Sequence, residues 1–408
     1  MNMNKRGLLG TALALALVIE CGLSGGARAQ QPPLRIGVLN DQSGSTSDVT
    51  GTGSVIAARL AIEDFGGSVL GRKIELLSGD HQNKTDIVAS ITRRWIDLDD
   101  VTAIFDGGTS AAALVIQDIV KEKKRIAMFS GPATSDLTGK SCSPFGFAWT
   151  YDTYALATTL PRSMVKSGSD SWFFITSNYA FGHALERDAT RVIERLGGKV
   201  IGKVRHPLAT SDFSSYLLQA QASGAKIIGL ANSGDDALNT IKQAAEFGIQ
   251  NGGQRIAGLL LLINTIHGLG LNTSQGIIVA ESFYWDTSEE TRQFSRRFEA
   301  LANKKPNMNQ AGVYSAVTHY LKAVQRAKTV DGQAVADAVR ALPVNDFMSK
   351  DVKVREDGRV MRDMHLFQVK SPAESKGPWD YYKFLSTVPG QDAFVPVAES
   401  ECPLLKSR

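Results

Sequence analysis

The chain repeats one pattern twice: short apolar runs alternate with stretches whose apolar residues recur at helical spacing. The repetition is interrupted between Phe129 and Ala157, where the loop Ser130–Asp136 is too rich in turn-forming residues to continue a strand or a helix. Phe147–Tyr151 then indicates a short extended segment. A chain that completes one α/β unit, crosses over and begins another leaves a cleft beside the crossover. We therefore interpret this segment as a hinge and expect a ligand site in the loops that face it.

The strands and helices of both units follow from this periodicity. In the first unit we expect strands at Leu34–Leu39, Lys73–Ser78, Thr102–Phe105 and Ile126–Phe129, and helices at Ser54–Phe65, Thr85–Asp97 and from Gly107 to about Val120. In the second unit we expect strands at Ser171–Thr176, Lys199–Arg205, Lys226–Leu230, Ile256–Ile263 and Ile277–Ala280, and helices at Tyr154–Lys166, Gly182–Leu196, Phe213–Ala222 and Asp235–Phe247.

The last third of the chain is predicted to return to the first unit. The aromatic segment Glu281–Asp286 is interpreted as the return crossover, and Leu342–Asn345 as a third one. Val352–Val369 is typical of a hairpin that turns at Glu356–Gly358. The helices expected to rebuild on the first unit are Glu289–Ala302, Gln310–Ala327 and Gly332–Ala341.

Alternating strands and helices predict an α/β protein with two doubly wound lobes, each built on a parallel sheet, joined by three crossovers. In such sheets ligands bind beyond the carboxyl ends of the strands. The loops expected there are Asn40–Gly53, Asp106–Ser110, Ser130–Asp136, Ser177–Gly182, Ala231–Asp236 and Asn264–Gly268.

The N-terminus is typical of an export signal. Lys5 and Arg6 precede the apolar run Leu8–Ile19, and Ala27-Arg28-Ala29 fits a cleavage site, so we expect cleavage near Ala29. A membrane anchor is the alternative, but the run is shorter than the roughly 20 residues that span a bilayer. Cleavage would leave Cys142 and Cys402 as the only cysteines. In an exported protein they are expected to form a disulfide, the alternative being two unrelated buried thiols.

Charge and motifs exclude several functions. The formal net charge of +4 falls further when the segment with Lys5, Arg6 and Arg28 is removed, so the composition predicts no affinity for nucleic acid or membranes. The sequence contains no nucleophile-elbow, zinc-protease or Walker pattern, and its histidines have no metal-ligand spacing. We expect neither an enzyme nor a bound cofactor or metal.

With these residues laid out, the whole mature chain resembles the periplasmic solute-binding proteins of ABC importers, specifically the branched-chain amino-acid-binding type. The matching segments are Ile36–Leu39 with Ser43-Gly44, Leu70–Leu76, Gly107–Ser110, Thr134–Thr138 and Tyr179–Gly182. The resemblance implies the type I periplasmic binding protein fold, a small-molecule ligand held between the lobes, a membrane permease as partner, and a periplasmic monomer.

The resemblance also suggests the site. Ser110, Ala133 and Thr134 would hold a carboxylate with hydroxyl and backbone N–H groups, as the first turn of a helix allows. Phe181 would be an aromatic wall with Tyr179 beside it, although both could simply pack the second lobe. The other candidate ligand-binding residues are Gln42, Ser43, Gly108, Thr109, Ser130, Gly131, Tyr151, Ser233, Asp235, Asn264 and Phe283.

The chain departs from its amino-acid-binding relatives at the ammonium site. There an acidic residue and a tyrosine of the second lobe hold the ammonium group, but Ala231–Asp236 and Leu262–His267 have neither at its place. Asp235 could substitute, although an aspartate before a helix is more often a cap. Because a buried ammonium without a carboxylate is costly, we expect a carboxylate ligand without an ammonium, as in the similar branch for aromatic acids. Amino-acid binding and a sensory ligand-binding module are the alternatives.

The expected domain limits follow from the crossovers. Residues 1–29 form the signal peptide, 30–148 with 286–343 the first lobe, and 149–285 with 344–385 the second lobe. Residues 386–408 form a tail that the disulfide ties to the first lobe.

Overall fold

The computed structural model describes residues 31–406, so the predicted signal peptide lies outside the described residues. The first lobe is built on a six-stranded sheet in the order β2-β3-β1-β4-β5-β6. It is parallel except for the short β2, which pairs antiparallel with β3. The strands are β1 (Leu34–Asn40), β2 (Ser68–Val69), β3 (Arg72–Asp80), β4 (Val101–Asp106), β5 (Ile126–Phe129) and β6 (Gly146–Ala148).

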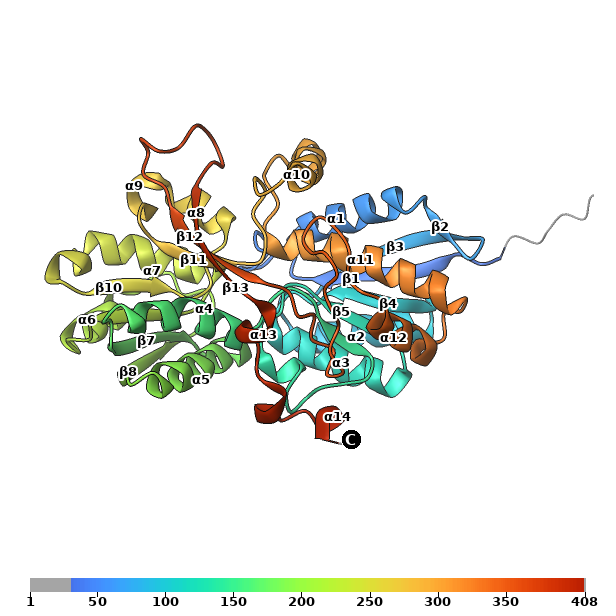
Figure 1. The fold of residues 1–408 in the computed structure, drawn as a ribbon, viewed down its shortest axis with the longest axis horizontal. Coiled ribbons are helices and arrows are strands. Elements are labelled where there is room, and N and C mark those ends of the chain that lie inside the picture. Colours follow the sequence, from blue (N-terminus) through green and yellow to red (C-terminus); the bar gives the residue numbers. More distant parts are fainter. Residues whose placement is uncertain (1–30, 407–408) are drawn as a thin grey trace, which may run out of the picture. The chain divides into compact units, whose positions relative to one another are not determined.

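Helices cover this sheet, and three of them come from the last third of the chain (Figure 1). The local helices are α1 (Gly51–Asp64), α2 (Thr85–Asp97) and α3 (Ser110–Lys123), and the returning ones are α10 (Glu289–Ala302), α11 (Met308–Ala327) and α12 (Gly332–Ala341). The long helix α11 packs against α1 and α12. Its buried face, including Val313, Val317 and Leu321, belongs to the main hydrophobic core.

The second lobe is built on a parallel four-stranded sheet in the order β10-β9-β7-β8. Its strands are β7 (Ser171–Ser177), β8 (Lys199–His206), β9 (Ile227–Ala231) and β10 (Arg255–Gly258). Its helices are α4 (Thr153–Lys166), α5 (Ala180–Arg195), α6 (Ser214–Ala222), α7 (Gly234–Glu246), α8 (Ile263–Leu269) and α9 (Leu271–Ser274). The predicted α/β fold with two parallel-sheet lobes is therefore confirmed.

A third, antiparallel sheet corrects the predicted hairpin. It has the order β11-β12-β13 and joins β11 (Ile278–Glu281), β12 (Met364–Val369) and β13 (Tyr382–Val388). Within Val352–Val369 only an isolated bridge, Val354 to Val360, pairs across the turn at Glu356–Gly358. The apolar alternation of β12 was visible in the sequence, but it pairs with the distant β11 and with β13 beyond the predicted hairpin, so the local pattern assigned it to the wrong partner.

The predicted strand Ile256–Ile263 is also wrong in its second half. β10 ends at Gly258, and helix α8 begins at Ile263, so the predicted loop Asn264–Gly268 is helical. Leu259, Leu260, Leu261 and Leu262 between them are buried. A continuous apolar run is the signature of a buried strand, but a core-packed connection produces the same run.

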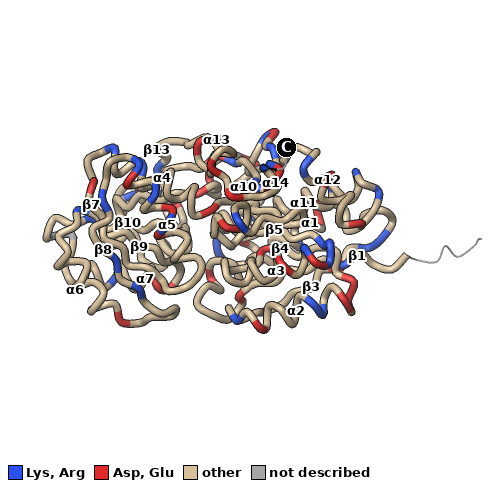
Figure 2. Tube along the Cα trace, turned by 90° about the horizontal axis from the view of Figure 1, so that it is seen from below, with Lys and Arg blue, Asp and Glu red and all other residues tan. Residues whose placement is uncertain are grey.

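Short elements complete the described chain. They are the 3-10 turns Ser135–Leu137, Ile249–Gly252 and Val397–Glu399, with α13 (Gly390–Ala393) and α14 (Pro403–Lys406). Acidic and basic residues are interspersed along both lobes (Figure 2), as the near-neutral composition predicts. Within residues 31–406, no helix combines the length and apolarity needed to cross a bilayer.

Cys142 and Cys402 form the predicted disulfide, with their Cα atoms 5.6 Å apart and 260 positions between them in sequence. Cys402 is fully buried and Cys142 nearly so. The bond ties the C-terminal segment after β13 to the loop that follows β5.

We expect Cys142→Ser together with Cys402→Ser to lower the free energy of unfolding by at most about 5 kcal/mol, because the disulfide restricts a long loop in the unfolded chain. Guanidinium titrations of both proteins measure the difference. Reductant should destabilise the wild-type protein toward the variant and leave the variant unchanged; equal stability of the two proteins would contradict the expectation.

Candidate functional site

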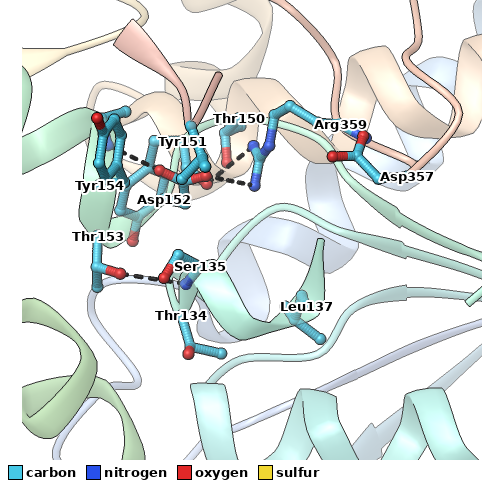
Figure 3. A network of polar contacts seen from close by, with 12 residues as sticks. Thr134, Ser135, Leu137, Thr150, Tyr151, Asp152, Thr153, Tyr154, Asp357 and Arg359 are labelled. Carbon is cyan, nitrogen blue, oxygen red and sulfur yellow. Dashed lines mark hydrogen bonds and ion pairs between the residues drawn. The ribbon is translucent and has the colours of Figure 1, made fainter. Parts of the chain in front are cut away.

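Two buried arginines fix the first crossover to the third, which in the structure is the whole connection between α12 and β12. Arg359 donates to the Tyr151 carbonyl at 3.1 Å and forms an ion pair with Asp152 at 3.3 Å (Figure 3). Arg362 donates from Nε to the Trp149 carbonyl at 3.1 Å. Both guanidinium groups are 1% exposed, and Asp152 is 2% exposed. Burial raises the pKa of the Asp152 carboxyl, and the charge of Arg359 opposes that rise.

The first crossover also lies along one face of α11. The Trp149 indole N–H donates to the Ser315 hydroxyl at 2.8 Å, and Asn309 lies near the Tyr151 hydroxyl. Between them, a Cβ at Gly312 would lie 2.2 Å from Thr150 Cγ2. Only a glycine therefore lets the crossover approach the helix this closely. The first crossover is therefore packed closely against α11.

The first-lobe residues predicted to hold a carboxylate lie close together, and they are almost completely buried. The Thr134 backbone N–H donates to the Ser110 hydroxyl at 3.1 Å, at the N-terminus of α3. The Tyr151 hydroxyl donates to the Gly131 carbonyl at 2.9 Å. Burial raises the pKa of Tyr151, so this phenol stays a donor. Ala133 lies in the same loop, 2% exposed.

Beneath these loops lies a buried acid that we did not predict as a site residue. Asp106 ends β4, is fully buried, and accepts a hydrogen bond from Asn40 Nδ2 at 2.7 Å. Burial raises the pKa of Asp106, while hydrogen bonds from Ser54 and from the Gly108 and Gly131 backbones oppose the rise. Its φ of +74° leads directly into two glycines in the same left-handed region. Asp106 therefore ties the turn before α3 to the loop after β5.

The second lobe contributes aromatic and polar residues at the carboxyl ends of β7 and β9. Tyr179 and Phe181 have ring centroids 5.9 Å apart, and Phe181 is 3% exposed. The Tyr179 hydroxyl is hydrogen-bonded to Ser233, which precedes α7. Burial raises the pKa of Tyr179. Phe181 belongs to the same hydrophobic cluster as Ala133 of the first lobe, and Tyr179 packs against this cluster.

Several other residues that were predicted to bind the ligand contact neighbouring protein residues. Gln42 and Ser43 hydrogen-bond Asp80 at 3.0 and 2.6 Å, which fastens their loop to β3. The Thr109 hydroxyl donates to Asn83 at 2.8 Å. Phe283 packs edge-on against Phe294 and Phe347 in the core.

The polar candidates near α7 and α8 lie toward the first lobe. Asn264 donates to Asp48 at 2.7 Å, which joins α8 to the loop between β1 and α1. Asp235 is largely exposed. Partial desolvation and the nearby charge of Asp48 together raise the pKa of its carboxyl. Ser130 and Gly108 lie in the buried first-lobe loops, and the Ser130 hydroxyl has no hydrogen-bond partner among the described residues.

A second buried acid lies at the return crossover. Glu281 ends β11, is 1% exposed, and accepts a hydrogen bond from the Tyr382 hydroxyl at 2.7 Å. The backbones of Ile263 and Met308, at the starts of α8 and α11, lie near the carboxyl and favour its charged form. Burial nevertheless raises its pKa to about 8. Neither Glu281 nor Asn309 was predicted, although an acid at the end of a buried strand was a usable signal.

The comparisons with known proteins agree with this architecture. A family model described as "Periplasmic binding protein" matches residues 33–378. The chain belongs to the periplasmic binding protein family. The sequence motifs predicted that the protein is not an enzyme, and its membership in a family of binding proteins agrees with this prediction. Among the described residues of this binding protein, no three His, Cys, Asp or Glu side chains are grouped to hold a metal ion.

Two solved structures are similar over nearly their whole length. A periplasmic binding protein of Burkholderia mallei is 45% identical, covers 91% of this chain and 99% of that one, and has a TM-score of 0.89. A branched-chain amino acid ABC transporter periplasmic ligand-binding protein of Burkholderia xenovorans is 39% identical, with coverage of 91% and 100% and a TM-score of 0.82.

More distant relatives are similar in part. The Leu/Ile/Val-binding protein homolog 6 of Brucella melitensis is 25% identical over 47% of this chain, and the match spans 48% of that protein. A solute-binding protein of Rhodopseudomonas palustris in complex with benzoate is 18% identical, covers 91% of this chain and 99% of that one, and has a TM-score of 0.79. At that identity the likeness concerns the fold alone.

We expect Arg359→Met to lower the free energy of unfolding of the binding protein by about 3–5 kcal/mol, because Asp152 would stay buried without its partner. Urea titration measures the loss. The control is Arg195→Met, which breaks an exposed pair with Glu399 and should cost at most about 1 kcal/mol. Similar losses in the two variants would contradict the structural importance of the buried pair.

Glu281 should make stability depend on pH. The pKa of Glu281 is about 8 in the folded protein, above the ordinary glutamate value of 4.5. Between these values the folded state keeps a proton that the unfolded state has lost, so Glu281 lowers stability by about 1.4 kcal/mol for each pH unit crossed. Below pH 4.5 Glu281 is protonated in both the folded and the unfolded state, so its effect on stability no longer changes with pH.

We therefore expect the stability of Glu281→Gln relative to wild type to increase as pH rises from 5 to 8. Urea titrations of both proteins at several pH values measure this difference. A difference that does not change with pH would contradict the raised pKa.

Proposed function

We propose that this protein is the periplasmic solute-binding component of an ABC importer and captures a small apolar carboxylate, with an aromatic acid as the preferred ligand. One observation carries the proposal: the buried first-lobe loop around Ser110 and Thr134 and the aromatic pair Tyr179 and Phe181 lie at the starts of α3 and α5, two helices that contact each other across the lobes. The first turn of α3 favours an anion, and the aromatic side chains offer apolar area to a ring.

The rest of the proposal follows from the family and the N-terminal pattern. An exported binding protein needs a membrane permease to receive its ligand, and we propose such a permease as partner of a monomer. Cleavage near Ala29 would release the mature chain into the periplasm. We propose the lobe limits 30–148 with 286–343 and 149–285 with 344–385, with 386–408 as a tail that the disulfide ties to the first lobe.

An amino-acid ligand is the second candidate, and Glu281 is the observation that favours it. The side chain is buried, but its Oε2 atom has no hydrogen-bond partner among the described residues. An ammonium group near this acid would stabilise its charged form. The similar protein of Burkholderia xenovorans is a branched-chain amino acid ABC transporter periplasmic ligand-binding protein. Asp235, the acid we had considered, is exposed and lies beside Asp48.

Calorimetry with benzoate, 4-hydroxybenzoate, leucine and valine separates these candidates. We expect binding of a benzoate and weak or no binding of the amino acids, because an ammonium would lose its hydration without a charged partner. Tight leucine binding with no response to either benzoate would overturn the preferred ligand. If leucine binds, loss of that binding in Glu281→Gln would support the second candidate.

Ser110→Ala should weaken binding of the responding carboxylate by about 1–3 kcal/mol, because its hydroxyl would bond a charged oxygen. Phe181→Ala should cost a similar amount, about 1.5–3 kcal/mol, through lost apolar burial. The matched control is Ser223→Ala, whose hydroxyl donates to the Ala220 carbonyl at the end of α6. An unchanged affinity in both Ser110→Ala and Phe181→Ala would place the ligand elsewhere.

A further inference from the structure

A polar contact links the two lobes at the loop between β1 and α1. Asn264, in the first turn of α8, donates from Nδ2 to Asp48 Oδ2 at 2.7 Å. Close by, a Cβ at Gly234, the first residue of α7, would lie 3.0 Å from the Ser45 carbonyl oxygen. The first-lobe loop therefore touches the starts of two second-lobe helices.

The first lobe holds Asp48 in place for this contact. Lys304 donates to the other Asp48 oxygen at 2.5 Å. Asn307, which caps α11, donates to the Val49 carbonyl at 2.9 Å and to the Asn264 side-chain oxygen at 3.2 Å. The Asn264 amide thus has first-lobe partners on both its nitrogen and its oxygen.

The charges around Asp48 favour its ionised form. Burial alone would raise the pKa of Asp48, but the hydrogen bonds from Lys304 and Asn264 outweigh it, so the pKa is lowered. Its other charged neighbours are His267, which favours the ionised form, and Asp235, whose own pKa the Asp48 charge helps to raise. Asp48 is therefore a carboxylate at neutral pH, and the bond from Asn264 is charge-assisted.

We propose that Asp48 and Asn264 form a latch, a pair of positioning residues that holds the lobes together. Lys304 and Asn307 prepare the first-lobe side of this latch. A contact made only when the lobes are together raises the closed fraction whether or not ligand is bound. Because apparent affinity scales with the fraction of competent molecules, the latch sets how tightly any ligand is held.

Small-angle X-ray scattering of the ligand-free protein tests the proposal without knowledge of the ligand. The protein is unfolded in guanidinium with its disulfide intact, dialysed to remove copurified ligand, and refolded. We expect the wild-type protein to have a smaller radius of gyration than Asp48→Ala, Asn264→Ala and the double variant. The double variant should show little more expansion than either single one, because the two residues form one contact.

Asp170→Ala is the matched control, since it removes an exposed ion pair with Lys226 within the second lobe. It should leave the radius of gyration at the wild-type value. Unchanged melting temperatures in the latch variants would show that expansion reflects lobe opening and not unfolding. The proposal is overturned if the wild-type and latch variants have the same radius of gyration, or if Asp170→Ala expands as they do.

Discussion

The buried ion pair between Arg359 and Asp152 is the interaction on which the arrangement of the crossovers depends. An unpaired charge at either position would be costly, because neither side chain reaches water. Asp152 also accepts a hydrogen bond from the Ala155 backbone at 2.7 Å and so caps α4. The pair therefore joins the start of a second-lobe helix to the third crossover. A buried pair is weak evidence for added stability, but it strongly specifies which segments lie together.

This constraint determines where a ligand can be held. With Trp149–Asp152 fixed to Arg359, Arg362 and α11, the Tyr151 ring projects toward the first-lobe loop that carries Gly131. The crossover is consequently held against both the first-lobe loop and α11. Motion of the lobes must come from backbone changes at the ends of the crossovers, as in the hinge closure known for periplasmic binding proteins.

The sequence predicted the elements well wherever a strong period was bounded by caps. The limits expected for α2, β5, α10 and α12 agree with the structure. Ser288 caps α10 through a capping box and Asp331 caps α12, so their starts were visible in the residues. The disulfide followed from the number of cysteines.

Features that depend on distant contacts could not be predicted in this way. The run Leu259–Leu262 is buried by tertiary packing, which periodicity cannot distinguish from sheet pairing. The site candidates Gln42, Ser43 and Phe283 matched by position, but their partners Asp80, Phe294 and Phe347 come from other parts of the chain. Desolvation of Asp106 and Glu281 also depends on tertiary burial, so the sequence could indicate them only as acids at strand ends and not as buried groups.

Because the pKa values of Asp106 and Glu281 are raised, a charged ligand nearby would change how many protons these two acids bind. An anion held above Asp106 would favour the neutral form of that acid, which burial already favours. A ligand carboxylate is therefore compatible with this cleft if binding is accompanied by proton uptake or if Asp106 is already protonated. An ammonium near Glu281 would act in the opposite direction and release the proton that a pKa of about 8 retains at neutral pH. The direction of proton exchange on binding thus reports which end of a ligand lies against which acid.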